Sequence, residues 1–335
     1  MRSAIVTGIV AALIGLVLVL GGGAENGPNP FVTLGVLNGA IYGLVALGLV
    51  LVYKGTRVFN FAQGEFGTLA AFFLFFSIDS EYGGLPYPVG IAIALTGVLL
   101  IGLAMERVII RPLINAPRVT VLVTTIAMAL FLVGVEILAF KAEPRSLSPM
   151  IQAIDQAGDV NTIQIFDLAV EPQRLIGLGV LAAFGVLLAF FFSRTDLGLA
   201  VLATSQDSFA TRVVGIGVER MSRFIWATAA LLGAVAGILY VPLTGALTPA
   251  VMTQNILIPA FTGAVLGGMT SLPGAFVGGV VIGFVQAVSL WAAGAWRVGG
   301  RAIQEIVPGS EQLAILVVLL VVLLARPQGL LGRET

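Results

Sequence analysis

Three polar side chains lie close together in the segment FNFAQGEFG, residues 59–67, between long apolar runs. Asn60, Gln63 and Glu65 supply two amides and a carboxylate, which hydrogen-bond to backbone groups or to a polar ligand. The apolar run after them, 66–78, forms about 20 Å of helix, too short for roughly 30 Å of hydrocarbon. Adding residues 60–65 restores the length. We therefore expect these side chains at membrane depth, unless the bilayer is locally thin.

Two interpretations of this polar segment are compatible. Asn60 is a favoured N-cap, and Gln63 three residues later completes a variant of the capping box. Glu65 then lies in the first helical turn, where the helix dipole favours it. Alternatively, the carboxylate faces a cavity or a partner, because acids at a helix centre cost about 2.5–3.5 kcal/mol and usually have a function. Transporters use such helix starts to present polar backbone groups to a substrate.

Three further polar side chains lie within expected membrane helices. Glu136 is near the outer end of its helix, where water or Lys141 could reach it. Asn38 and Tyr42 are four residues apart and share a face with a stripe of glycines. They line a path through the protein or form hydrogen bonds between helices.

The composition requires a membrane for most of the chain. Of the 335 residues, 58% are hydrophobic and 10% are charged, with a mean hydropathy of +1.06, whereas soluble domains have roughly 25% charged residues. The net charge of zero gives no indication of nucleic-acid binding. The chain has no cysteine and no histidine, so it lacks the commonest metal ligand and proton shuttle, and we expect no metal site.

We predict an all-α polytopic transmembrane bundle of about 10 spans, forming a single domain over residues 1–335. The expected spans are 3–22, 31–53, 60–78, 88–105, 119–140, 175–193, 222–242, 255–270, 273–293 and 311–325. With both termini in the cytoplasm, 12 of the 17 Lys and Arg residues fall inside, as the positive-inside rule requires. The eighth and ninth runs are short and glycine-rich, so they could be re-entrant. Glycines at every fourth residue, as in 35–43 and 233–237, predict close helix packing.

Three segments lie outside this core pattern. Residues 1–30 form an extra first span with an external linker, or a signal peptide that is cleaved. Residues 141–174 form an acidic, proline-containing external loop, and residues 194–221 form a cytoplasmic loop. Within the cytoplasmic loop, polar residues that favour caps, an apolar face and closing glycines predict a short amphipathic helix that lies on lipid or docks into a partner. Its residues are Ser205, Asp207, Phe209, Arg212, Val213, Gly215 and Gly217.

Several segments resemble the permease subunits of branched-chain amino acid (Liv-type) ABC transporters. They are LNGAIYGLVALGLVLVYK, NFAQGE, MERVIIRPL, LGLAVLATSQDSFATRVVGIGVERM, AVLGGMTSLPGAFVGGVVIGFVQAV and RPQGLLGR. The resemblance covers nearly the whole chain after residue 30. NFAQGE and LGGMTSLPGA are its most specific parts.

The resemblance implies the vitamin B12-permease-like fold and a bacterial plasma (inner) membrane protein. It implies a second permease subunit, identical or different, two ATPase subunits and an external substrate-binding protein. ATP and Mg²⁺ would bind to the ATPases, because this chain has no Walker A motif. The candidate translocation path comprises Asn38, Tyr42, Asn60, Gln63 and Glu65, and the loop around 205–217 would be the ATPase-coupling element.

The sequence departs from the family in two places. Gln63 stands where relatives often have histidine, and the cytoplasmic loop has Gly198-Leu199-Ala200 and fewer basic residues than relatives do. The latter leaves open which ATPase the loop fits.

Other functions stay open at this point. An ion-coupled secondary transporter would place acids within the bundle, and Glu65 and Glu136 are the only candidates. The same type of permease could carry urea or short amides. A membrane enzyme would need a cluster of catalytic side chains, and no span supplies one.

Overall fold

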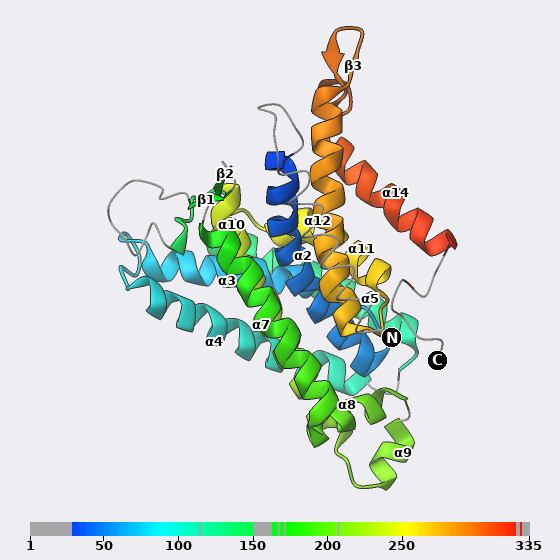
Figure 1. Ribbon diagram of the computed structural model, residues 1–335. Coiled ribbons are helices and arrows are strands. Elements are labelled where there is room, and N and C mark those ends of the chain that lie inside the picture. Colours follow the sequence, from blue (N-terminus) through cyan, green and yellow to red (C-terminus); the bar gives the residue numbers. More distant parts are fainter. Residues whose placement is uncertain are drawn as a thin grey trace. The chain divides into compact units, whose positions relative to one another are not determined.

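The computed structural model describes residues 29–113, 116–150, 163–165, 168–170, 172–206, 208–325 and 329 (Figure 1). The predicted span 3–22 and Asp207 lie outside the described residues. The longer helices are α2 (Asn29–Thr56), α3 (Gln63–Ile78), α4 (Tyr87–Met105), α5 (Arg118–Phe140), α7 (Pro172–Arg194), α8 (Asp196–Gln206), α10 (Val218–Thr244), α11 (Ile258–Gly267), α12 (Leu272–Ala295) and α14 (Ser310–Ala325). The shorter elements are the π-turns η1 (Glu106–Ile110) and η3 (Thr253–Leu257), the 3-10 turn η2 (Arg111–Leu113), α9 (Ser208–Val213), α13 (Ile303–Ile306) and the strands β1 (Ile163–Ile165), β2 (Leu168–Val170), β3 (Arg297–Val298) and β4 (Arg301–Ala302).

The contacts divide the chain into two compact units. Unit 1 comprises the described parts of Met1–Ala46, Val160–Ala182 and Pro259–Thr335. Unit 2 comprises the described parts of Leu47–Asp159 and Ala183–Ile258. The helices α2 and α7 contribute residues to both units.

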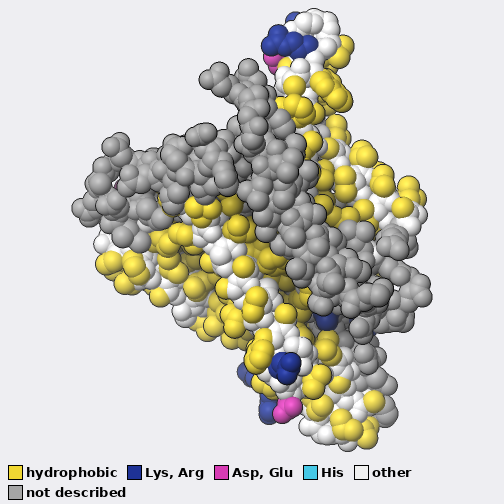
Figure 2. Space-filling model, viewed as in Figure 1, with side chains coloured by type: hydrophobic (Ala, Val, Ile, Leu, Met, Phe, Trp, Pro, Cys, Tyr) yellow, Lys and Arg dark blue, Asp and Glu magenta, His cyan; other side chains and the backbone are white. Residues whose placement is uncertain are grey.

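Six helices of the described chain are long and apolar enough to cross a membrane. They are Leu37–Thr56, Tyr87–Leu113, Arg118–Phe140, Pro172–Arg194, Val218–Thr244 and Leu272–Ala295. The apolar helices α3 and α14 are shorter. Figure 2 shows hydrophobic side chains over most of the described surface in that view, with charged groups over the β3–β4 hairpin and near the end of α7. The chain is therefore an all-α membrane protein with six to eight candidate spans among its described residues.

The nine predicted spans that begin after residue 30 each contain a helix, and two of them need comment. In 255–270, the π-turn η3 precedes α11, which has only 10 residues and is about 15 Å long, too short to cross alone. In contrast, α12 has 24 residues. The ninth run is therefore long enough to span the membrane and need not be re-entrant.

Local sequence signals explain where several helices begin and end. The helices α4 and α5 start directly after Pro86 and Pro117, because proline lacks the N–H of a helix interior and disfavours a helical conformation in the residue before it. The hydroxyl of Ser271 caps α12 by accepting the N–H of Gly274 at 3.1 Å. Gly245 ends α10 with a left-handed backbone, φ 70°, which glycine adopts without steric cost.

Glycine contacts hold the helices of each unit together. In unit 2, α3 packs against α4 and α10, and a methyl group added at Gly237 would lie 2.1 Å from the carbonyl oxygen of Gly67. In unit 1, a methyl group at Gly278 of α12 would lie 2.0 Å from the carbonyl oxygen of Gly263 in α11. The predicted role of the glycine stripes in helix packing is confirmed.

Two small antiparallel hairpins, β1–β2 and β3–β4, were not predicted. The second has Gly299 and Gly300 at its turn, with φ 61° and 84°. Two successive residues with positive φ are typical of a two-residue hairpin turn. The pair of glycines in WRVGGRA was therefore an overlooked signal.

Candidate functional site

The site lies in unit 2, around the start of α3. The turn before this helix is held by Thr125 of α5, whose Oγ1 lies 3.0 Å from the carbonyl oxygen of Phe59 and accepts the N–H of Phe61 at 3.4 Å. Within the turn, Asn60 Oδ1 accepts the N–H of Ala62 at 3.1 Å. The helix begins at Gln63, after Ala62. The prediction that Asn60 is the N-cap is therefore wrong, because its side chain stabilises the preceding turn instead.

Gln63 connects α3 to α10. Its Nε2 donates to the carbonyl oxygen of Ala229 at 2.8 Å, and its Oε1 accepts from Asn60 Nδ2 at 3.2 Å. These bonds replace the predicted capping box, in which Gln63 would bind the backbone of Asn60. A methyl group on Gly48 of α2 would lie 2.3 Å from Gln63 Nε2, so only glycine leaves room for this side chain. The amides of Asn60 and Gln63 are fully buried and thus hydrogen-bonded to each other and to α10.

Two buried carboxyl groups, from Glu65 and Glu136, interact with each other electrostatically. Both side chains are 0% exposed. Glu136 Oε2 accepts the N–H of Ala250 at 3.0 Å, whereas its Oε1 and both oxygens of Glu65 have no hydrogen-bond partner among the described residues. The prediction that Glu65 lies inside the protein near a helix start is confirmed. The expectation that water reaches Glu136 is wrong, because α5 buries this side chain inside unit 2.

The segment 250–253 brings α3 and α5 together at this point. Ala250 has a left-handed backbone, φ 61°, which is strained for a residue other than glycine and is often found at functional sites. Two residues later, the N–H of Met252 donates to Thr68 Oγ1 of α3 at 3.3 Å. A methyl group on Gly64 would lie 2.2 Å from Thr253 Oγ1. No sequence signal marks Ala250, and Thr68 and Thr253 were overlooked beside the more polar residues.

This arrangement can hold a positive charge. Two carboxyl groups in a dry interior repel each other when both are ionised, so a proton or a cationic group between them offsets the repulsion. The hydroxyls of Thr68 and Thr253 add neutral oxygens to the same region. Within the described residues, no three His, Cys, Asp or Glu side chains are grouped closely enough to bind a metal ion.

The remaining two predicted path residues, Asn38 and Tyr42, lie in unit 1. Arg174 Nη1 of α7 donates to Asn38 Oδ1, and the Tyr42 hydroxyl donates to Gln286 Oε1 of α12. Both bonds connect α2 to another helix, which is one of the two roles expected for these side chains. The structure thus places Asn60, Gln63 and Glu65 in unit 2, and Asn38 and Tyr42 in unit 1.

A comparison with known families gives the decisive observation. The family described as "Branched-chain amino acid transport system / permease component" matches residues 31–325. The chain belongs to this family. As a permease component, it is a transport subunit and not an enzyme.

Relatives with related names match over most of their length. The permease is 29% identical to BraD of Pseudomonas aeruginosa, a high-affinity branched-chain amino acid transport system permease protein, over 89% of this chain and 94% of the relative. It is 27% identical to LivH of Escherichia coli K12 with the same coverage. A probable LivH of Methanocaldococcus jannaschii is 26% identical over 86% and 88% of the two chains. No solved structure matches the permease.

The loop 194–221 of the permease is largely helical. It contains α8 and α9, and Gly215 follows α9 with φ 85°, in agreement with the predicted helix end. Val213 and Val214 are 71% and 73% exposed. Arg212 is exposed and lies 3.7 Å from the carboxylate of Glu219. The side chains of Ser205 and Phe209 are outside the described part of the chain.

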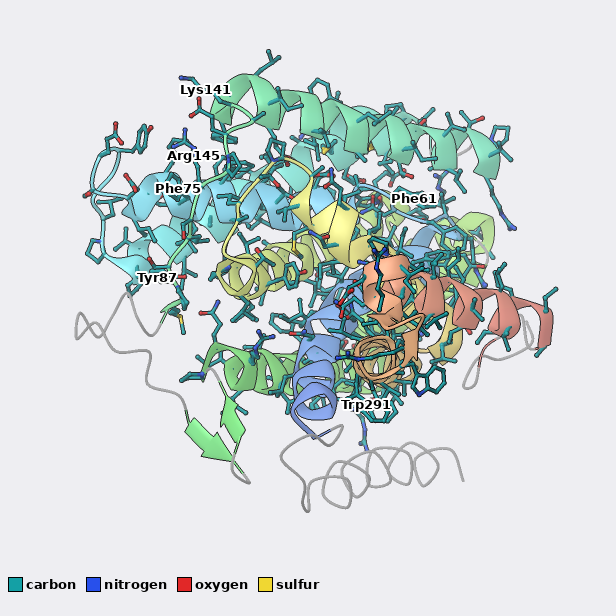
Figure 3. The ribbon with its side chains drawn as sticks, turned by 90° about the horizontal axis from the view of Figure 1, so that it is seen from above. Phe61, Phe75, Tyr87, Lys141, Arg145 and Trp291 are labelled. Atoms are coloured by element: carbon teal, nitrogen blue, oxygen red, sulfur yellow. The ribbon has the colours of Figure 1, made fainter. Side chains whose placement is uncertain are left out.

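A cavity of about 630 Å³ lies at the C-terminal end of α3, whereas the polar site lies at its start. It is lined by Phe75, Tyr87 and Ser146, among others. The guanidinium of Arg145 lies 5.3 Å from the ring centre of Phe75 (Figure 3), a distance at which cation and ring attract each other. None of the predicted path residues lines this cavity, so volume alone does not locate the polar site of the permease.

Proposed function

We propose that this permease forms the membrane path of an ATP-driven importer of branched-chain or related amino acids. The family match over residues 31–325 carries this proposal, and the relatives named for branched-chain amino acid transport support the substrate class. We further propose a single transmembrane domain of about ten spans with the vitamin B12-permease-like fold. It pairs with a second permease subunit in the plasma membrane and acts with two ATPases and an external binding protein.

The polar site at the start of α3 fits this role. Its carboxyl groups can receive a positive charge, and an amino acid carries an ammonium group. The apolar surroundings suit an aliphatic side chain. Asn60, Gln63 and Glu65 are therefore our candidates for part of the translocation path.

Uptake into proteoliposomes tests the proposal. The permease, reconstituted with its proposed ATPase and binding-protein partners, should import labelled leucine, isoleucine or valine only with ATP inside. Uptake driven by a proton or sodium gradient without ATP would instead identify a secondary transporter. Competition by urea or short amides, but not by leucine, would place the same permease in the alternative substrate class.

The proposed orientation, with both termini in the cytoplasm, can be tested by cysteine labelling. The chain has no cysteine, so single substitutions report without background. Asp155→Cys should react with an impermeant maleimide from outside, because 141–174 is proposed to be external. Val214→Cys, at a position that is 73% exposed, should react only after the membrane is opened. The reverse pattern would overturn the topology.

The α8–α9 segment is the proposed coupling element. Val213→Asp should weaken binding of the ATPase by about 30-fold, the effect of losing an apolar anchor that contributes ~2 kcal/mol. Phe209→Ala should act in the same direction. Co-elution with the ATPases and ATP hydrolysis stimulated by the binding protein measure both effects.

A matched control is available on the β3–β4 hairpin. Val298→Asp replaces a valine that is 61% exposed and should leave ATPase binding unchanged. Wild-type co-elution and hydrolysis in both loop variants would exclude this segment as the coupling element.

A further inference from the structure

Unit 2 has a further cavity, which is separate from the carboxyl pair of Glu65 and Glu136 and from the cavity beside Tyr87. It has a volume of about 270 Å³ and lies where α2 ends at Thr56 and where α5 and α10 begin at Arg118 and Val218. These three helices are among the six that are long and apolar enough to span a membrane. The ends of such helices lie near the boundary between hydrocarbon and headgroups. The cavity is therefore at the depth of lipid headgroups.

The charge of this cavity is positive. Arg57 and Arg118 line it, and neither Asp nor Glu does so among the described residues. Arg57 has a left-handed backbone, φ 58°, and its N–H donates to the carbonyl oxygen of Tyr53 at 2.8 Å. Arg57 thus follows the last residue of α2 and lines the cavity in a strained conformation. Backbone strain of this kind is common at binding sites.

The remaining wall is mainly apolar. Its larger apolar side chains are Val58, Ile110, Leu113, Val121, Val218 and Ile225. Of the three hydroxyls, those of Thr56 and Thr204 donate to helix carbonyls, Val52 O at 2.9 Å and Ala200 O at 2.8 Å. Ser222 contributes the third hydroxyl. The cavity is thus lined by two arginines and by apolar side chains.

This combination fits a phosphate that is attached to an acyl chain. A guanidinium group forms paired hydrogen bonds with phosphate oxygens. Two arginines from different helix ends can together bind more oxygens than the two that a carboxylate has, which favours a phosphate. The volume is several times the roughly 30 Å³ of a liquid water molecule, which accommodates a headgroup but no whole lipid. Apolar side chains beside the arginines suit the adjoining glycerol and acyl carbons. Basic pockets between transmembrane helices commonly bind such headgroups.

We propose that the cavity between the ends of α2, α5 and α10 binds the phosphate group of an anionic membrane phospholipid. Arg57 and Arg118 bind the phosphate oxygens, and the apolar wall contacts the lipid. Neighbouring basic residues, Arg107 and Arg111, raise the local concentration of anionic lipid without lining the cavity. This site is independent of the substrate, so its failure leaves the proposed function intact.

Lipid retention by the purified full-length permease tests the proposal. Native mass spectrometry in detergent should show phosphatidylglycerol bound in preference to phosphatidylcholine. Arg57→Ala with Arg118→Ala should reduce phosphatidylglycerol retention at least about tenfold, equivalent to ~1.4 kcal/mol, because charge-assisted hydrogen bonds to the phosphate are lost. Arg220→Ala with Arg223→Ala removes two exposed arginines from the first turns of α10 outside the cavity, and should retain the lipid.

A cavity-filling variant tests the cavity without changing its charge. Ser222→Leu should also lose the lipid while keeping both arginines. Equal phosphatidylglycerol retention by the wild type, the double arginine variant and Ser222→Leu would overturn the proposal. Thermal protection by inorganic phosphate, without any preference for phosphatidylglycerol, would overturn the assignment to a lipid.

Discussion

A single methyl group at Gly237 is expected to lower the stability of the purified permease by roughly 1–3 kcal/mol, the usual cost of overpacking a core. The added carbon would lie 2.1 Å from the carbonyl oxygen of Gly67 and 2.5 Å from its carbonyl carbon. Both are backbone atoms, so α3 and α10 must move apart. Gly237→Leu should prevent recovery of a monodisperse protein. Size-exclusion chromatography after heating measures both effects.

The matched control for this prediction is Gly134→Ala in α5. A methyl group there meets nothing within 4 Å, and alanine has a higher helix propensity than glycine. Gly134→Ala should therefore leave stability unchanged or raise it slightly. Equal melting behaviour of Gly134→Ala and Gly237→Ala would show that α3 and α10 do not pack at Gly67.

Replacing the carboxyl group of Glu65 by an amide is expected to reduce transport at least about tenfold, equivalent to ~1.4 kcal/mol on the rate-limiting barrier. Glu65→Gln keeps the size of the side chain but cannot become an anion that receives a cationic group. Because the Glu65 oxygens have no hydrogen-bond partner among the described residues, the variant should fold and assemble. ATP-dependent uptake and the yield of assembled complex separate the two effects.

Glu81→Gln is the control, because Glu81 is an exposed acid in the turn after α3. It should transport at the wild-type rate. Wild-type uptake by Glu65→Gln as well would leave the carboxylate with a structural role at the helix start and remove it from the path.

Much of the fold was predictable because it depends on local signals. Pro86, Pro117 and Ser271 set helix starts through their own backbone or side-chain geometry. The burial of Glu65 inside the protein was predicted from an apolar run that is too short to cross a membrane. Asn60 was misassigned as the N-cap because asparagine favours both helix caps and turns. The sequence does not show whether the cap is Asn60 or Ala62, two residues later.

The partners of the carboxyl groups were not predictable. Glu136 accepts a hydrogen bond from Ala250, 114 residues later, and Thr68 accepts one from Met252, 184 residues later. The first contact depends on the left-handed backbone of Ala250, for which alanine gives no local signal. Nothing in the periodicity of α5 distinguishes a buried acid near a helix end from one that meets water.

The burial of α3 has a consequence for how the protein is made. Gln63 finds its acceptor in Ala229, 166 residues later. At about 5–20 residues per second, the ribosome needs roughly 10–30 s to reach it. The helix α3 is too short to cross the bilayer alone. During that interval the amides of Asn60 and Gln63 and the carboxylate of Glu65 lack the helix that later covers them. We therefore expect α3 to leave the translocon late, held beside α2 and α4 until α10 emerges.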